Sequence, residues 1–398
     1  MLQIRIESPP LVAFGPPEDS SGALLSGILH LYPRLQSSAD LSNASFVVEK
    51  LEMTFVMEVT TKRPLKRDCP TCTTRSKVLH TWALIPSRMT LQYNNGAPHG
   101  FPFSFLIPGD LPATTQSSLA IISYKLVAEA TPASSPNILS TSGPERSSTP
   151  NNFRPVILSQ PIKLSRSILS NGEPKHAHRI FPPTAISAII DLPAVIYPGA
   201  TDNEVDIIFS GLNIDDSKSR WSLQKIAWQI DELAKVISPA CATHLSKVGG
   251  VGGKGILYED TRTVGTGQIL SGWKYNYVSG KAEVVLLVGT TLKAMAACHV
   301  DAMSGVHVSH NLRIECVVVE ERYHPSNGAV RLEMYEAIGD ARVLRMSFPI
   351  IVTERGGMGI SWDEEIPPRY EDVAWNAPPT FAQSEGSVVA EHRDSTED

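Results

Sequence analysis

The chain has 398 residues, with 42 % apolar and 19 % charged side chains, which is the composition of a soluble protein of about two globular domains. No apolar run reaches the roughly 18 residues that span a bilayer, and the segment MLQIRIESPP lacks the apolar region of a secretory signal. The five cysteines form an odd set without a disulfide framework, so we expect a cytosolic protein.

The charge is unevenly distributed along the chain. The formal net charge is −6, but residues 356–398 contain ten acids and two arginines, so residues 1–355 carry a net charge of +2. A charge this small gives no reason to expect nucleic acid as a partner. A mildly basic body can still approach acidic peptides or anionic lipid.

Alternation of apolar and polar side chains indicates β-strands along most of the chain. Successive side chains of a strand point to opposite faces, so an alternating run is typical of a half-buried antiparallel strand. The 30 prolines separate strands and would break helices. Many short strands of this kind predict an all-β fold of antiparallel sandwiches. The clearest runs are Leu51, Met53, Phe55, Met57 and Val59; Phe101, Phe103, Phe105 and Ile107; Leu312, Ile314, Cys316 and Val318; and Leu344, Met346, Phe348 and Ile350.

One segment, SLQKIAWQIDELAKVI at residues 222–237, has a different period. Its apolar residues from Leu223 to Ile237 follow helical spacing, so periodicity alone predicts a helix. The residues Ile226, Trp228 and Ile230 also fit one face of a strand.

Three stretches have little to bury. Residues 131–152, rich in Ser, Thr, Pro and Asn, are predicted to form a mobile surface insertion. The segment SNGEPKHAHR has the composition of a linker, and everything after about Arg355 is rich in Gly, Pro and acid. We therefore expect an N-terminal sandwich over residues 1–170, a linker over 171–179, a second sandwich over 180–355 and a disordered acidic tail over 356–398.

The segment GVGGKG, residues 250–255, matches the dinucleotide-binding pattern G-x-G-x-x-G. That motif works only between a strand and a helix, and the following ILYEDTRT is no amphipathic helix. Gly255 also stands where a nucleotide-phosphate loop needs Ser or Thr. We interpret the segment as a mobile glycine loop. Because no G-x-S-x-G, H-E-x-x-H or paired-carboxylate pattern occurs, the sequence singles out no catalytic residue.

The spacing of the cysteines indicates a metal site. DCPTC places Cys69 and Cys72 at the C-x-x-C spacing with which two thiolates hold a tetrahedral Zn²⁺, and PACATH places Cys241 and His244 at C-x-x-H spacing. Together the four would close a structural zinc site that joins the two domains. The alternative is two unrelated loops with free thiols, because about 170 residues separate the two pairs. No cofactor is otherwise required.

A basic run, TKRPLKRD, contains Lys62, Arg63, Lys66 and Arg67 in one expected loop. Such a run is usually a solvated surface. The alternative is that it docks an acidic cytosolic segment of a partner or anionic lipid head groups.

The acidic tail contains the sequence Pro-Pro-x-Tyr at Pro367, Pro368 and Tyr370. The two prolines favour polyproline II geometry, which lowers the ordering cost of binding an aromatic groove, and this sequence is the ligand pattern of WW domains. A second copy, APPTF, has Phe381 in place of the tyrosine and is not counted as a site. Chance occurrence in a proline-rich tail is the alternative interpretation.

The chain resembles the fungal arrestin-related trafficking adaptors, or alpha-arrestins, and within them the branch of amino-acid-permease adaptors. The likeness covers nearly the whole chain in ordered blocks. The blocks are ESPPLVAFGPPEDSSGALLSGILHLY, HGFPFSFLIPGDLPATTQSSLAIISYKLVAEA, WSLQKIAWQIDELAKVISPACATHLSKVGG, EDTRTVGTGQILSGWKYNY, VSHNLRIECVVVEE and VLRMSFPIIVTERGGMGISWDEEIPPRYEDV.

The resemblance implies two tandem arrestin-type sandwiches, with a strand rather than a helix at residues 223–237. It implies a non-enzymatic adaptor that brings a HECT-type ubiquitin ligase, through its WW domains, to plasma-membrane transporters. It also implies a cytoplasmic protein recruited peripherally to the plasma membrane, endosomes or Golgi, with phosphorylation in mobile segments at residues such as Ser147, Ser148 and Thr149. DCPTC and PACATH would lie in loops near the domain junction. Family members usually carry more than one Pro-Pro-x-Tyr, whereas this chain has one good copy.

Two other functions stay open at this point. One is a sorting-coat scaffold of the same shape that works without a ubiquitin ligase, and it leaves Pro-Pro-x-Tyr without a role. The other is an enzyme with a zinc or thiol centre at Cys69 and Cys72, which would need an open coordination position on the metal.

Overall fold

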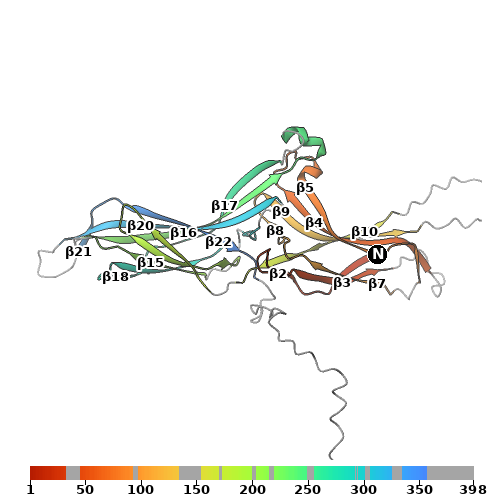
Figure 1. Cartoon of the computed structure of the whole chain (residues 1–398), viewed down its shortest axis with the longest axis horizontal. Helices are drawn as coiled ribbons and strands as arrows, with labels where there is room; N and C mark the ends of the chain where they lie inside the picture. Colours follow the sequence, from red (N-terminus) through yellow and green to blue (C-terminus); the bar gives the residue numbers. More distant parts are fainter. Residues whose placement is uncertain are drawn as a thin grey trace, which may run out of the picture. The chain divides into compact units, whose positions relative to one another are not determined.

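The structure is a computed structural model that describes residues 1–32, 45–92, 97–133, 154–169, 173–199, 203–214, 219–248, 255–291, 293, 295–300, 305–324 and 334–355. Antiparallel sheets make up nearly all of the regular structure in these ranges (Figure 1). The all-β fold class predicted from the alternating runs is therefore confirmed. Within the described ranges, no helix combines the length and apolarity that crossing a lipid bilayer demands.

The first eleven strands form the sheets of the N-terminal part. They are β1 (Leu2–Ile6), β2 (Leu11–Phe14), β3 (Ala23–Leu31), β4 (Ser45–Thr61), β5 (Thr74–Ile85), β6 (Met89–Gln92), β7 (His99–Ile107), β8 (Thr115–Gln116), β9 (Ala120–Pro132), β10 (Val156–Ile162) and β11 (Leu164–Ser167). One sheet has the order β1-β3-β7, and a second has the order β10-β9-β4-β5 with β6 on β4 and β8 on β9. The short strand β11 pairs in parallel with β2.

The remaining strands form two further sheets. They are β12 (Lys175–Ile180), β13 (Ser187–Leu192), β14 (Val195–Ile196), β15 (Asn203–Ser210), β16 (Ser219–Ser238), β17 (Ile256–Ile269), β18 (Lys274–Asn276), β19 (Lys281–Val288), β20 (Val306–His324), β21 (Met334–Ala337) and β22 (Arg342–Val352). The sheet orders are β12-β13-β15-β19-β18 and β14-β22-β20-β16-β17, with β21 on β20. Because β12 pairs with β13 along its whole length, the linker predicted for residues 171–179 is wrong from Lys175 onward.

The predicted apolar runs become the two hydrophobic cores. In β4, the side chains of Leu51, Met53 and Phe55 are fully buried, and the Phe55 ring stacks on Tyr124 with 5.7 Å between ring centroids. In β20, four alternating side chains are fully buried in the second core: Leu312, Ile314, Cys316 and Val318. Each such side chain contributes roughly 1.5–3 kcal/mol through removal of apolar surface from water.

Residues 222–237 lie in β16, so the helix predicted from periodicity alone is wrong and the strand implied by the family resemblance is right. Gln224 is an extra residue in the pairing of β16 with β20, because Leu223 faces Val318 while Lys225 faces Val317. A bulge of this kind moves the inward positions from odd to even numbers. The inward-facing residues Leu223 and Ile226 are therefore three positions apart. This is the spacing expected of a helix, although both residues lie in a strand.

Strand β16 passes from one hydrophobic core into the other. Ile230 belongs to the core of the second pair of sheets, whereas Ala234 and Val236 pack in the core that the N-terminal strands share. Val306 and Val308 of the neighbouring β20 pack in that N-terminal core too. Apolar side chains of the C-terminal half thus complete the N-terminal core, and the end of β16 lies beside the end of β4.

Candidate metal centre and basic loop

The two cysteine motifs each form one helical turn at a connection between strands. Cys69 precedes helix α1 (Pro70–Thr73), between β4 and β5, and Cys241 precedes the 3₁₀ helix η2 (Ala242–Val248), between β16 and β17. The backbone N–H of Cys72 donates to the carbonyl of Cys69 at 3.1 Å, and that of His244 donates to the carbonyl of Cys241 at 2.9 Å. Residues three apart in such a turn lie on one side, so each motif presents two donor atoms together.

These four side chains converge from sequence positions 172 residues apart. The Sγ atoms of Cys69 and Cys241 lie 3.7 Å apart, and His244 Nδ1 lies 3.4 Å from Cys72 Sγ and 3.1 Å from Cys241 Sγ. All four donor atoms lie within 4.8 Å of one another. Cys72 is buried, while the other three residues are half-buried. Figure 1 shows the turns that carry them side by side.

Two threonines support the sulfurs of this cluster. Thr71 Oγ1 lies 3.1 Å from Cys69 Sγ, and Thr243 Oγ1 lies 3.0 Å from Cys241 Sγ. Hydrogen bonds, chiefly the one from the Thr243 hydroxyl, lower the pKa of the Cys241 thiol to about 5. A lowered pKa favours the thiolate, the form in which a cysteine binds metal. Sequence reasoning missed both threonines, although each occupies the third position of its motif.

The turns are joined by further polar contacts at the strand ends. Thr61, the last residue of β4, places Oγ1 3.2 Å from Oγ of Ser238, the last residue of β16. The Ser238 hydroxyl also donates to the carbonyl of Arg63 at 2.7 Å. The ends of β4 and β16 are thus tied together, eight residues before Cys69 and three residues before Cys241.

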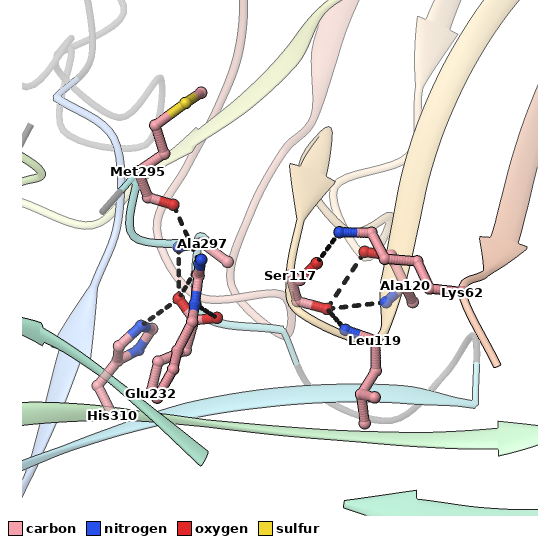
Figure 2. A network of polar contacts seen from close by, with 9 residues as sticks. Lys62, Ser117, Leu119, Ala120, Glu232, Met295, Ala297 and His310 are labelled. Carbon is pink, nitrogen blue, oxygen red and sulfur yellow. Dashed lines mark hydrogen bonds and ion pairs between the residues drawn. The ribbon is translucent and has the colours of Figure 1, made fainter. Parts of the chain in front are cut away.

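The basic loop, residues 62–68, connects Thr61 with Cys69, and its four cationic side chains are all exposed. Lys62 Nζ donates to the carbonyl of Ser117 at 2.6 Å, so this lysine is bound to its own domain (Figure 2). Arg63, Lys66 and Arg67 make no side-chain hydrogen bond or ion pair to another described residue. Three cations are therefore free to meet an anionic partner.

Sequence reasoning also missed a buried acidic residue on β16. Glu232 is fully buried, and its carboxylate accepts two hydrogen bonds from Arg262 at 2.8 and 2.9 Å and one from the Ala297 N–H at 2.8 Å. His310 Nε2 lies 3.7 Å from the same carboxylate, and Figure 2 shows His310 and Ala297 beside Glu232. Arg262 and His310 are the cross-strand neighbours of Glu232 on β17 and β20. The sequence feature that could have revealed this buried residue is the acidic pair Asp231-Glu232 inside an otherwise apolar strand.

Several predicted sites lie outside the described residues. They are the tail motif of Pro367, Pro368 and Tyr370, the phosphorylation positions Ser147, Ser148 and Thr149, and the glycine loop apart from Gly255. Their sequence predictions therefore stand as predictions.

Comparisons with known proteins agree on one family. Residues 51–248 match the family model LDB19, described as arrestin N-terminal-like, and this range includes both cysteine motifs. The chain is 34 % identical to the Schizosaccharomyces pombe protein C1F12.05 over 96 % of its own length and 89 % of that protein. It is 25 % identical to the protein LDB19 of Eremothecium gossypii, over 98 % of the chain and 83 % of the relative. The protein LDB19 of Saccharomyces cerevisiae is 22 % identical, over 79 % of the chain and 64 % of the relative.

Proposed function

The chain belongs to the arrestin-related trafficking adaptors of the LDB19 type, and from this premise we propose that it recruits a HECT-type ubiquitin ligase to plasma-membrane transporters. The transporters are then ubiquitinated and internalised. The observation that carries this proposal is the sequence Pro367-Pro368-x-Tyr370 in a chain of this family. The role is that of a non-enzymatic bridge between two partners.

The ligase contact follows from the chemistry of the tail motif. Two adjacent prolines restrict the backbone to polyproline II geometry, so little conformational entropy is lost when a WW domain binds. The Tyr370 ring fills a neighbouring aromatic pocket, and its hydroxyl adds a polar contact. Tandem motifs raise the effective concentration of a ligand at the ligase, and a chain with one Pro-Pro-x-Tyr motif lacks this gain. We therefore expect cargo binding to assist ligase recruitment.

The cargo contact is assigned to the basic loop. Arg63, Lys66 and Arg67 are exposed cations without partners among the described residues, and an acidic cytosolic segment of a transporter complements them. Anionic lipid head groups of the same membrane add to this attraction. The protein is thereby recruited from the cytoplasm to the plasma membrane, endosomes or Golgi. Phosphates at Ser147, Ser148 or Thr149 would lower the small positive charge of the body and oppose docking.

Tyr370→Ala is expected to abolish binding of the full chain to a WW-domain ligase, because it removes the aromatic anchor of the motif. The measurement is pull-down of the purified ligase by wild type and variant, with thermal unfolding recorded in parallel. Phe381→Ala in the APPTF copy is the matched control and should leave ligase binding unchanged.

If Tyr370→Ala retained the ligase as well as wild type, the tail assignment would be wrong. Transporter turnover in cells that express a chain truncated at Arg355 distinguishes the adaptor from the ligase-independent scaffold. Turnover that stops supports the adaptor, and unchanged endocytosis supports the scaffold.

Lys66→Glu with Arg67→Glu is expected to weaken binding of an immobilised Asp/Glu-rich peptide roughly tenfold or more, because two exposed attractions become repulsions. The difference in peptide affinity between the variant and wild type should shrink as the salt concentration is raised, because salt screens exposed charges. The matched control is Lys274→Glu with Lys281→Glu, an equal charge change at exposed residues of β18 and β19. Equal weakening by both pairs would mean that net charge, rather than this loop, governs docking.

A further inference from the structure

We propose that Cys69, Cys72, Cys241 and His244 bind one structural zinc ion, which fastens the β4–β5 connection to the β16–β17 connection. This inference is independent of the ligase and goes beyond the adaptor function proposed above. It rests on the convergence of two sequence-distant motifs, the donor types and the spacing of the donor atoms.

Two of the three donor distances match the edges of a zinc tetrahedron, and the third, 3.1 Å between Cys241 Sγ and His244 Nδ1, is about 0.4 Å shorter than such an edge. Bond lengths of about 2.3 Å to sulfur and 2.0–2.1 Å to nitrogen place two sulfurs about 3.8 Å apart and a sulfur and a nitrogen about 3.5 Å apart. The observed Cys69–Cys241 distance between sulfurs is 3.7 Å, and His244 Nδ1 lies 3.4 Å from Cys72 Sγ. Three thiolates and one imidazole are a donor set that selects zinc among common divalent cations. Four protein ligands fill the coordination sphere, which makes the site structural rather than catalytic.

The two halves of the site repeat one design. Each motif reads Cys-x-Thr-Cys or Cys-x-Thr-His, and in each the threonine hydroxyl contacts the sulfur of the leading cysteine at 3.1 or 3.0 Å. Hydrogen bonds to ligand atoms from an outer shell orient them and hold thiolates at metal sites. If the two loops were unrelated and held free thiols, three shared features would be unexplained. These are the threonine, the helical turn and the convergence of the sulfur and nitrogen atoms on one point.

The local charge suits a thiolate-rich site. Three thiolates and one Zn²⁺ leave a net charge of −1, and the exposed cations Lys66, Arg67 and Lys247 are close in sequence to its ligands. The main alternative is a disulfide between Cys69 and Cys241, but their sulfurs are 3.7 Å apart and both cysteines are free, whereas a disulfide needs about 2.05 Å. A disulfide would also leave Cys72 and His244 without a role.

Zinc at this position would fix the second end of the basic loop. Thr61 is held by Ser238 at the first end, and Cys69 would be held through the metal to Cys241 and His244. The loop of residues 62–68 is then fixed at both ends to strands of both halves of the chain. Zinc would therefore order the loop.

Metal content is the first test. Full-length protein, purified without added metal or chelator, is expected to carry about one zinc ion per chain by inductively coupled plasma mass spectrometry. Cobalt exchanged into the site should give the visible absorption bands of tetrahedral thiolate coordination. Iron in place of zinc, or less than about a tenth of an equivalent of any metal, would overturn the proposal.

His244→Asn and Cys72→Ala identify the ligands. Both variants should lose zinc, whereas the matched controls His178→Asn, at an exposed residue of β12, and Cys316→Ala, outside the cluster, should keep it. If a ligand variant is insoluble, the metal content of wild type still decides the matter. Full retention of zinc by both ligand variants would refute the assignment.

Hydrogen exchange tests the bridge itself. Stripping zinc from wild type with a chelator should lower the protection of backbone amides in residues 69–73 and 241–248 together by at least about tenfold. The amides of β13 and β15, which lie away from the cluster, should be unchanged. Loss of protection at one turn alone, or at neither, would show that the metal does not join the two connections. These measurements use neither ligase nor cargo, so they stand or fall separately from the proposed function.

Discussion

Replacing Glu232 by glutamine is expected to lower the free energy of unfolding by about 3 kcal/mol at pH 7. The substitution keeps the shape of the side chain and removes its charge. Arg262 then loses its ionic partner, in a place where the carboxylate is fully buried. Breaking a buried pair by removing one partner typically costs about 3–5 kcal/mol.

The environment of Glu232 explains the size of the effect. Burial on its own would raise the pKa of this carboxyl group, but the neighbouring His310, the Arg262 guanidinium and the Ala297 N–H outweigh it and lower the pKa to about 2. His310 lies 3.7 Å away, beyond hydrogen-bonding distance, so we assign most of the stabilisation to the two hydrogen bonds from Arg262. The contact with Ala297 also ties residues 295–300 to β16 (Figure 2).

The pH dependence follows from the direction of this shift. The ordinary pKa of a glutamate is 4.5, and in the folded protein it is about 2. A carboxyl group with a lowered pKa stabilises the fold fully above its unfolded value, and the stabilisation is lost as the pH falls through the folded value. The difference in unfolding free energy between wild type and Glu232→Gln should therefore be constant from pH 7 to about 5 and should narrow below about 4.5.

Urea unfolding across this pH range measures the difference. The matched control is Glu315→Gln, because Glu315 pairs with Arg345 on the same sheet at 3.1 Å but at an exposed position. An exposed pair contributes about 0–1 kcal/mol, so this variant should differ little from wild type at any pH. A loss for Glu232→Gln that stayed constant down to pH 3 would mean that packing, not charge, is responsible.

The strands could be predicted where a single face is buried. The alternating runs of β4, β20 and β22 all follow the period of two, and their apolar residues lie in the two cores. The prediction failed where the register changes. The bulge at Gln224 is set by pairing with β20, so the local sequence of β16 could not distinguish a shifted strand from a helix.

The candidate site shows a similar limit. The spacing within each cysteine motif was readable, because one turn brings residues three apart together. The meeting of Cys69 with Cys241 depends on β4 and β16 ending side by side, which is a property of the whole fold. Glu232 was missed for the same reason, since Arg262 and His310 become its neighbours only through the register of three strands. Short-range patterns therefore predicted which residues could bind metal or carry charge. Long-range strand pairing determined which of these residues lie next to one another in the fold.

Arg166 is expected to be the most sensitive single side chain of the N-terminal sheets. It lies in β11, is 3 % exposed, and donates to the backbone carbonyls of Gly15, Gly109 and Leu111. The first of these carbonyls follows β2, and the other two lie in the turn between β7 and β8. One guanidinium thus closes two turns around a parallel strand pair that is only four residues long, because its planar fork offers several donors at fixed angles.

Arg166→Met should lower the free energy of unfolding by roughly 3–5 kcal/mol, because it leaves three carbonyls without their charged donor while the apolar stem is kept. Arg166→Lys should recover only part of the loss, since one ammonium group cannot reach three carbonyls with the geometry of the fork. Lys163→Met is the matched control. Its side chain is 67 % exposed and pairs with Glu354 at 2.9 Å, so about 1 kcal/mol or less is expected. Urea unfolding of the three variants measures these differences. If Arg166→Lys had the same free energy of unfolding as wild type, charge alone, rather than the geometry of the guanidinium, would hold the two turns.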